Sequence, residues 1–157
     1  MNNISISMTS FAARNELSDI SSEIDNLVRS NCLAIKSVRV RTVEHQKYNA
    51  LIRNGVHKGE AEAIAWIVSQ PKGQRPAFVS NDRGARNAAL QQHLEAGDVM
   101  DLLVCLVRLG SLTQQETEKL TTQWSEHVNA FCRPTDYKDF YTTFQARSDP
   151  QISCPQI

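Results

Sequence analysis

The sequence has no hydrophobic run long enough to cross a membrane, because a spanning helix needs about 20 consecutive apolar residues. Its first residues, Met1 to Ser5, have neither the basic nor the apolar region of a secretory signal. Its 17 basic and 17 acidic residues cancel, so it lacks the positive excess of a polybasic nucleic-acid binder. We therefore expect a cytoplasmic protein with no membrane partner. Neutrality still permits an acidic site that is offset by a basic rim.

Metal-ligand and nucleotide motifs are also missing. The four cysteines are widely separated and form no CxxC or Cys/His spacing, which argues against a structural zinc site. Cys105 stands in an apolar run and is interpreted as a small buried hydrophobic residue, with the thiols of the chain reduced. The HExxH pattern and the glycine-rich patterns of P-loop and dinucleotide-binding proteins do not occur. The acidic residues are therefore the main candidates for chemistry.

Hydrophobic patterning predicts strands that alternate with helices. Short apolar or alternating runs predict strands over 4–8, 34–43 and 77–79. Amphipathic spacing, capping residues and Gly or Pro stops predict a first helix that follows a cap at Thr9 or Ser10 and ends near Asn31, and further helices over 44–53, 58–70, 83–94, 99–109 and 113–124. This order is typical of an α/β fold with a mainly parallel central sheet flanked by helices. Periodicity is lost after Arg133 and Pro134, so we expect about the last 15 residues to form a loose tail.

Asp82 is the first candidate site residue. It follows the predicted strand 77–79 and precedes a predicted helix. Ligands of open α/β sheets bind at the carboxyl ends of the strands, so a carboxylate at this point is placed for chemistry. The simpler interpretation is that Asn81 or Asp82 caps the helix that begins at Arg83. The sequence alone leaves both interpretations open.

Further acidic residues stand near predicted helix starts. Glu60 lies one turn before Ile64, at the beginning of an otherwise apolar helix face, and Glu62 is turned away from it by roughly 200°. An acid at a helix start is also stabilised by the helix dipole alone, so a purely structural role stays open. Glu16, in the first predicted helix, would by itself be a solvated glutamate. Asp98 is interpreted first as the cap of the helix over 99–109.

Together these segments resemble the PIN domain family. The resemblance is carried by Gly59-Glu60-Ala61-Glu62-Ala63-Ile64-Ala65 and by Ala77-Phe78-Val79-Ser80-Asn81-Asp82-Arg83-Gly84-Ala85-Arg86. They are similar to the GE-E-A-I-A helix and the strand ending in D-R-x-A-R of a bacterial, toxin-like group of these nucleases. The leucine-rich stretch after Gly97-Asp98 fits the same group, and Thr9 to Leu17 resembles the segment that supplies the family's second acid. The similarity covers about residues 4–125.

The resemblance implies a ribonuclease that hydrolyses phosphodiester bonds with carboxylates gathered around Mg²⁺ or Mn²⁺. These cations prefer carboxylate oxygens, lower the pKa of bound water and neutralise charge on the scissile phosphate. The implied catalytic metal ligands are Glu16, Glu60 and Asp82, with Glu62 as a further metal neighbour. Ser80 and Asn81 are implied to orient Asp82 or the water. The residues expected to contact phosphates, or else to be ordinary solvated charges, are Lys58, Arg83 and Arg86.

The sequence departs from the family at its beginning. A PIN domain normally starts with a central strand that ends in an aspartate, and no such strand precedes Glu16. We therefore expect an N-terminally incomplete PIN-like domain over 1–128 and a partly irregular C-terminal extension over 129–157.

The resemblance to the PIN domain family implies two alternative functions. The first is an endoribonuclease, the toxin or effector of a bacterial toxin–antitoxin pair, with an antitoxin or other protein partner and, by resemblance, a homodimeric state. The alternative is a non-catalytic PIN-like module that binds a protein or RNA because the first acidic residue is missing.

Overall fold

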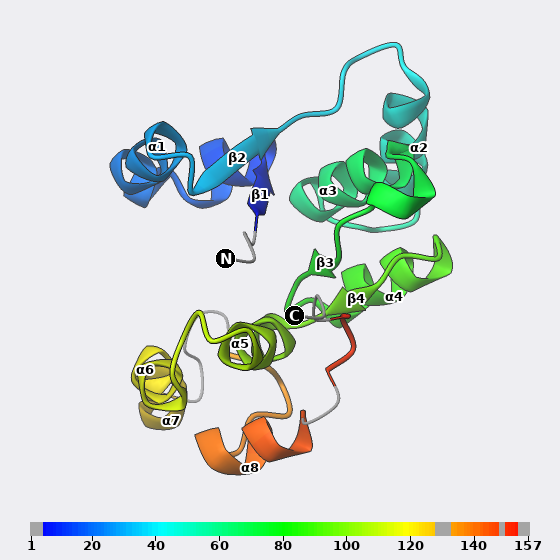
Figure 1. Ribbon diagram of the computed structural model, residues 1–157. Coiled ribbons are helices and arrows are strands. Elements are labelled where there is room, and N and C mark those ends of the chain that lie inside the picture. Colours follow the sequence, from blue (N-terminus) through cyan, green and yellow to red (C-terminus); the bar gives the residue numbers. More distant parts are fainter. Residues whose placement is uncertain (1–4, 128–132, 148–149, 154–157) are drawn as a thin grey trace. The chain divides into compact units, whose positions relative to one another are not determined.

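The computed structural model describes residues 5–127, 133–147 and 150–153 of the chain. Figure 1 shows a mixed α/β structure. The chain forms two compact units that divide between Pro76 and Ala77, and the described part of each contains a pair of parallel strands. Within the described ranges, no helix is both long and apolar enough to span a membrane. The mixed α/β class and the parallel pairing are as predicted, but the described strands form two two-stranded sheets where one central sheet was expected.

In the first unit, β1 (Ile6–Thr9) pairs with β2 (Leu33–Lys36), with Ile6 opposite Leu33. Parallel strands need a crossover connection, which here consists of two short turns, η1 (Ala12–Glu16) and η2 (Ser18–Ile20), and helix α1 (Ser21–Arg29). The predicted strand over 34–43 is too long. It ends early because the backbone N–H of Val38 donates to Glu62 rather than to a neighbouring strand.

Helices α2 (Val43–Arg53) and α3 (Lys58–Ser69) complete this unit and pack against each other (Figure 1). Thr42 caps α2 by accepting a 3.3 Å hydrogen bond from the backbone N–H of His45. Gly55 follows the end of α2 with a φ of 83°, a conformation that favours glycine. Both helices were predicted to within one residue at each end. A short 3₁₀ turn, η3 (Lys72–Gln74), follows α3.

In the second unit, β3 (Phe78–Val79) pairs in parallel with β4 (Ala96–Gly97), and α4 (Arg83–Gln91) connects them. The sequence did not predict β4, because two residues carry no periodicity. Helix α4 is shorter than the predicted 83–94, since His93 adopts a left-handed φ of 56° just beyond its end. Helix α5 (Val99–Arg108) follows β4 directly, as predicted for this apolar stretch.

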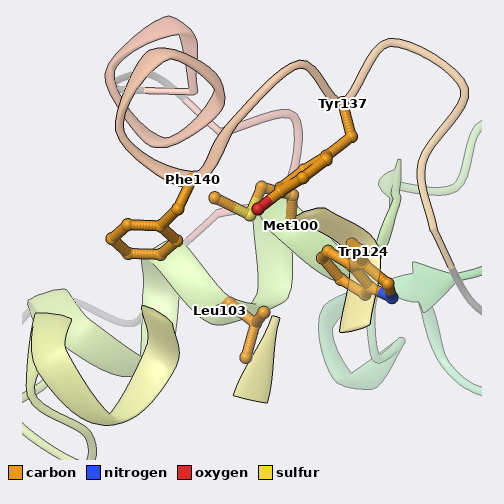
Figure 2. Close-up of a cluster of buried hydrophobic side chains, with 5 residues drawn as sticks. All are labelled: Met100, Leu103, Trp124, Tyr137 and Phe140. Atoms are coloured by element: carbon orange, nitrogen blue, oxygen red, sulfur yellow. The ribbon is translucent and has the colours of Figure 1, made fainter. Parts of the chain in front are cut away.

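The core of the second unit forms where α5 meets the C-terminal elements. These are α6 (Gln114–Leu120), α7 (Thr122–Glu126) and α8 (Phe140–Ala146). Figure 2 shows the buried cluster, which consists of Met100, Leu103, Trp124, Tyr137 and Phe140. The predicted single helix over 113–124 is divided at Thr121, whose hydroxyl donates back to the carbonyl of Glu118.

The C-terminal segment is not the loose tail that the sequence suggested, as far as the structure describes it. Ile152 is buried, and the backbone N–H of Gln151 donates to Asp101 at 3.3 Å. Cys105 is buried, as predicted, with its sulfur 3.8 Å from the carbonyl oxygen of Ile152. Cys105 is nevertheless disulfide-bonded, so the prediction of reduced thiols is wrong at this residue, whereas Cys32 is a free, exposed thiol.

Candidate functional site

The predicted site residues divide between the two units. Glu16, Lys58, Glu60 and Glu62 belong to the first unit. Ser80, Asn81, Asp82, Arg83 and Arg86 belong to the second unit. The side chain of Glu16 lies outside what the structure describes, and its backbone is part of η1.

Glu60 lies in the first turn of α3. His57, the N-cap residue of this helix, forms no side-chain capping bond. Its carboxylate oxygen Oε2 is buried and has no hydrogen-bond partner in the described part of the chain. Leaving a buried acceptor unsatisfied costs about 1–3 kcal/mol, so native proteins normally supply such an atom with a partner, an ordered water or an ion. An acidic side chain in the first turn of a helix also interacts favourably with the helix dipole. This carboxylate therefore fits the role of a cation ligand.

Glu62, two residues further along α3, has a different environment. It is only 8% exposed, and both of its oxygens accept hydrogen bonds. Oε1 accepts from the hydroxyl of Ser10 at 3.0 Å and from the N–H of Val38 at 3.3 Å, and Oε2 accepts from the N–H of Phe11 at 2.8 Å. Glu62 thus links α3 to the segments that follow β1 and β2. This geometry gives it a structural role, and its assignment as a metal neighbour stays a prediction.

Asp82 lies just beyond β3 and caps α4. Its Oδ1 accepts a 2.7 Å hydrogen bond from the backbone N–H of Ala85, and its own N–H donates to the hydroxyl of Ser80 at 3.1 Å. The capping interpretation is confirmed. The capping bond uses Oδ1, which leaves Oδ2 outside it, and the bond fixes the orientation of the carboxylate. Asp82 therefore combines a structural bond with an oriented acidic group at a strand end.

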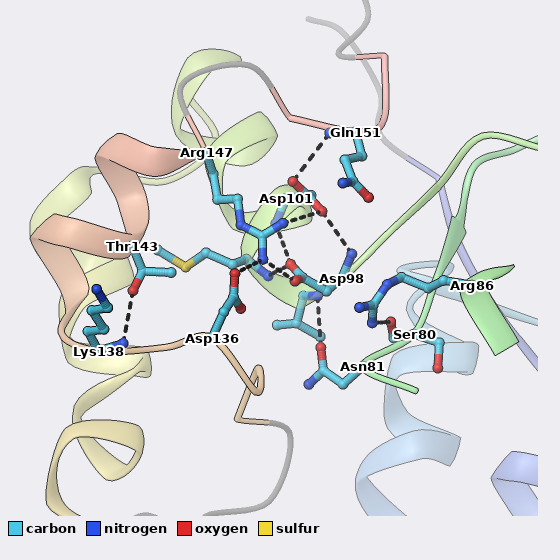
Figure 3. Close-up of polar contacts among 12 residues, drawn as sticks. Ser80, Asn81, Arg86, Asp98, Asp101, Asp136, Lys138, Thr143, Arg147 and Gln151 are labelled. Atoms are coloured by element: carbon cyan, nitrogen blue, oxygen red, sulfur yellow. Dashed lines mark hydrogen bonds and ion pairs between the residues drawn. The ribbon is translucent and has the colours of Figure 1, made fainter. Parts of the chain in front are cut away.

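The neighbours of Asp82 hold the same strand end in place. The guanidinium of Arg86 donates to the carbonyl oxygen of Ser80 at 2.7 Å, and Asn81 accepts from the N–H of Val99 at 3.1 Å (Figure 3). Ser80 therefore supports the backbone of Asp82, while Asn81 connects β3 to the start of α5. Arg83 is exposed on the first turn of α4. Of the two arginines, Arg83 is the one whose side chain is exposed toward solvent.

A buried ion-pair network lies around the start of α5 (Figure 3). Asp98 and Asp101 are 1% and 0% exposed and form a reciprocal capping box, which confirms Asp98 as the helix cap. The guanidinium of Arg147 lies 2.7 Å from Asp98, 3.5 Å from Asp101 and 2.8 Å from the exposed Asp136. Burial raises the pKa of the Asp98 carboxyl, against the opposing effects of its backbone hydrogen bond and of Arg147. Arg147 thus supplies the positive charge that these acids require.

The first unit also contains a cavity that the sequence did not indicate. Its volume is about 300 Å³, and its walls include Phe11, Arg14, His45, Tyr48 and Glu62. These residues come from η1, from the turn before it and from helices α2 and α3. They are widely separated in sequence and match no motif, so no local signal marks them as neighbours. Glu62 alone among these five was a predicted site residue.

No group of three or more His, Cys, Asp or Glu side chains lies ready to hold a metal ion within residues 5–127, 133–147 and 150–153. Comparison with known proteins supplies no relative either, because no family model, curated protein or solved structure matches the chain. We therefore infer function from the chemistry of this chain's own residues.

Proposed function

We propose that this chain is a divalent-metal-dependent nuclease that hydrolyses the phosphodiester bonds of RNA. The observation that carries the proposal is the buried Oε2 of Glu60, which has no hydrogen-bond partner in the part of the chain that the structure describes. A cation is a fitting partner for a buried carboxylate oxygen, because it compensates both the lost hydration and the charge. Mg²⁺ and Mn²⁺ are the candidates, since both prefer oxygen ligands.

The carboxylates that the resemblance assigns to metal binding are Glu16 and Glu60 in the first unit and Asp82 in the second unit. Glu60 is the one whose buried oxygen supports the assignment. A bound Mg²⁺ or Mn²⁺ would lower the pKa of a water and neutralise charge on the scissile phosphate. Asp82 is held in a fixed orientation by its bonds to Ala85 and Ser80, so its carboxylate needs little reorganisation to act as a ligand. Preorganisation of this kind lowers the cost of binding.

Basic residues next to these acids would bind the nucleic acid. Lys58 and Glu60 share the first turn of α3, and Arg83 follows Asp82 at the start of α4. Cations at these positions can contact phosphates that flank a scissile bond, and such contacts make affinity depend on salt. Arg86 is already bonded to the carbonyl of Ser80, so we assign it to supporting Asp82.

The proposal includes a PIN-like arrangement of the strands and helices. The parallel pairing of β1 with β2 and of β3 with β4 is compatible with that arrangement. The proposal also includes a cytoplasmic location and, by the same resemblance, a toxin-like role with an antitoxin or other protein partner and a homodimeric state. These parts depend on the resemblance and are tested after activity has been established.

Cleavage of single-stranded RNA tests the nuclease directly. The purified chain is incubated with labelled RNA in Mn²⁺, in Mg²⁺ and in EDTA. Glu60→Gln should lower metal-dependent cleavage about 100-fold or more, because a neutral amide is a poor ligand for these cations. Glu44→Gln is the matched control, since Glu44 also occupies the first turn of a helix of the same unit. Equal cleavage by wild type and Glu60→Gln would contradict the proposal.

A non-catalytic module that binds RNA or protein is the second candidate. The capping bond of Asp82 favours it, because a helix cap requires no metal. Under this alternative, RNA binding persists while Mn²⁺ neither binds the chain nor supports cleavage.

A further inference from the structure

The cavity of the first unit has a fixed framework. Glu62 receives hydrogen bonds from Ser10, Phe11 and Val38 and so holds two separate chain segments at one wall. The other wall is α2, on which His45 and Tyr48 are three residues apart and therefore share a face. Their rings are stacked, with centroids 6.1 Å apart and planes inclined by 15°. The cavity is thus bounded by preformed aromatic and polar surfaces.

The charges around the cavity favour an anionic ligand. The negative charge of Glu62 is already compensated by its three donors. Arg14 is exposed and makes no hydrogen bond or ion pair with any described residue. The ammonium of Lys58 lies 5.9 Å from the centre of the Phe11 ring, which places a second positive charge beside a cavity residue. A ligand would therefore meet uncompensated positive charge next to aromatic rings.

Cations interleaved with aromatic rings are typical of surfaces that bind single-stranded nucleic acid. The bases stack on the rings, whose faces accept any base, while the cations contact the phosphates. The volume of about 300 Å³ is near the lower end of the range for small-molecule sites, which suits one nucleotide rather than a folded partner.

We propose that this cavity binds a single nucleotide, with its base against Phe11 and Tyr48 and its phosphate at Arg14. The nucleotide is either one residue of an RNA strand or a free mononucleotide, and both offer the same chemistry. As a subsite for substrate, this inference rests on the proposed nuclease function. As a binding site, it is independent of Glu60 and of metal, so the two proposals can fail separately.

Binding is measured in EDTA, where no metal-dependent cleavage occurs. Fluorescence anisotropy follows a labelled single-stranded RNA oligonucleotide, and unlabelled UMP and AMP serve as competitors. Tyr48→Leu removes the flat ring but keeps apolar bulk, and Arg14→Gln removes the charge. Each should weaken RNA binding about tenfold or more. Arg53→Gln, an exposed arginine at the last turn of α2, is the matched control and should bind as wild type does.

The competitors identify the source of the nucleotide. An oligonucleotide that binds at least tenfold more tightly than UMP and AMP, with both affinities lowered in Arg14→Gln, indicates an RNA subsite. Similar affinities for all three, lowered in the same variant, indicate a site for free mononucleotides. Unchanged binding of every ligand by both Arg14→Gln and Tyr48→Leu would overturn the proposal.

A second measurement needs no substitution and is therefore independent of folding defects in a variant. RNA that carries 4-thiouridine is photo-crosslinked to the wild-type chain, and the crosslinked peptides are identified by mass spectrometry. The proposal expects crosslinks in the segments 10–15 and 38–48, which contain cavity residues. Crosslinks found exclusively in other segments would overturn it, even if RNA binds tightly.

Discussion

The guanidinium of Arg147 lies 2.7 Å from the carboxylate of Asp98, and this ion pair joins the end of α8 to the start of α5. Asp98 and Asp101 are both buried, and Arg147 forms an ion pair with each of them. Breaking a buried pair by removing one partner is far more destabilising than the pair is stabilising. The described residues after Arg133 are therefore an integral part of the second unit.

The first prediction concerns Arg147. Arg147→Met should lower the free energy of unfolding by about 3–5 kcal/mol, because Asp98 and Asp101 stay buried and lose their ion-pair partner. Urea unfolding followed by circular dichroism measures the change. Asp136→Asn is the control, since Asp136 is 61% exposed in the same network and should cost less than about 1 kcal/mol. An Arg147→Met midpoint equal to that of wild type would refute this account.

The second prediction concerns pH. Burial raises the pKa of Asp98 in the folded state above its ordinary value of 3.8, which it keeps in the unfolded state. At pH values between the unfolded and the folded pKa, the Asp98 carboxyl is therefore protonated in the folded state and ionised in the unfolded state. The contribution of Asp98 to stability is therefore full below the unfolded pKa and declines as pH rises through the folded pKa. The free energy of unfolding, measured over this pH range, should decline with rising pH in wild type and should decline less in Asp98→Asn. The same slope in both proteins would contradict the assignment.

The third prediction separates the two glutamates of α3. Glu62→Ala should destabilise the first unit by about 3 kcal/mol, because the N–H groups of Phe11 and Val38 lose their acceptor. Hydrogen exchange at these two amides should accelerate. Glu60→Gln should leave stability nearly unchanged, since Oε2 of Glu60 has no partner to lose among the described residues. Slow exchange at Phe11 and Val38 in Glu62→Ala would show that Glu62 is not the anchor.

The fourth prediction concerns Asp82. Asp82→Asn should keep the cap of α4, because Asn is as good a capping residue as Asp, and it should abolish metal-dependent cleavage. Asp82→Ala should lose cleavage and also about 1 kcal/mol of stability. Thermal unfolding and RNA cleavage are measured on both variants. Full cleavage by Asp82→Asn would leave Asp82 with a structural role alone.

The sequence predicted the elements whose signals are local. Helices α2 and α3 have apolar periodicity and clear stops, and Asp98 and Thr113 both form the capping bonds that their positions suggested. Strand β4 escaped prediction because its pairing with β3 depends on tertiary contact rather than on its two residues. The strand over 34–43 was predicted too long, because the N–H of Val38 donates to the side chain of Glu62 and not to a neighbouring strand.

Among the candidate residues, the sequence predicted local bonds but not long-range contacts. The capping role of Asp82 follows from its position between a strand and a helix, and the structure bears it out. The contacts of Glu62 join residues 51 and 52 positions apart, and Arg147 lies 49 positions from Asp98, so no local pattern reveals them. The cavity residues come from separate elements for the same reason.

Calorimetric titration of the purified chain with Mn²⁺ tests the central claim most directly. The account predicts saturable binding by wild type and by Glu44→Gln, and binding weakened at least about tenfold in Glu60→Gln, whose folding should be intact. Mn²⁺ binding that is absent from wild type, or equally strong in Glu60→Gln, would contradict it.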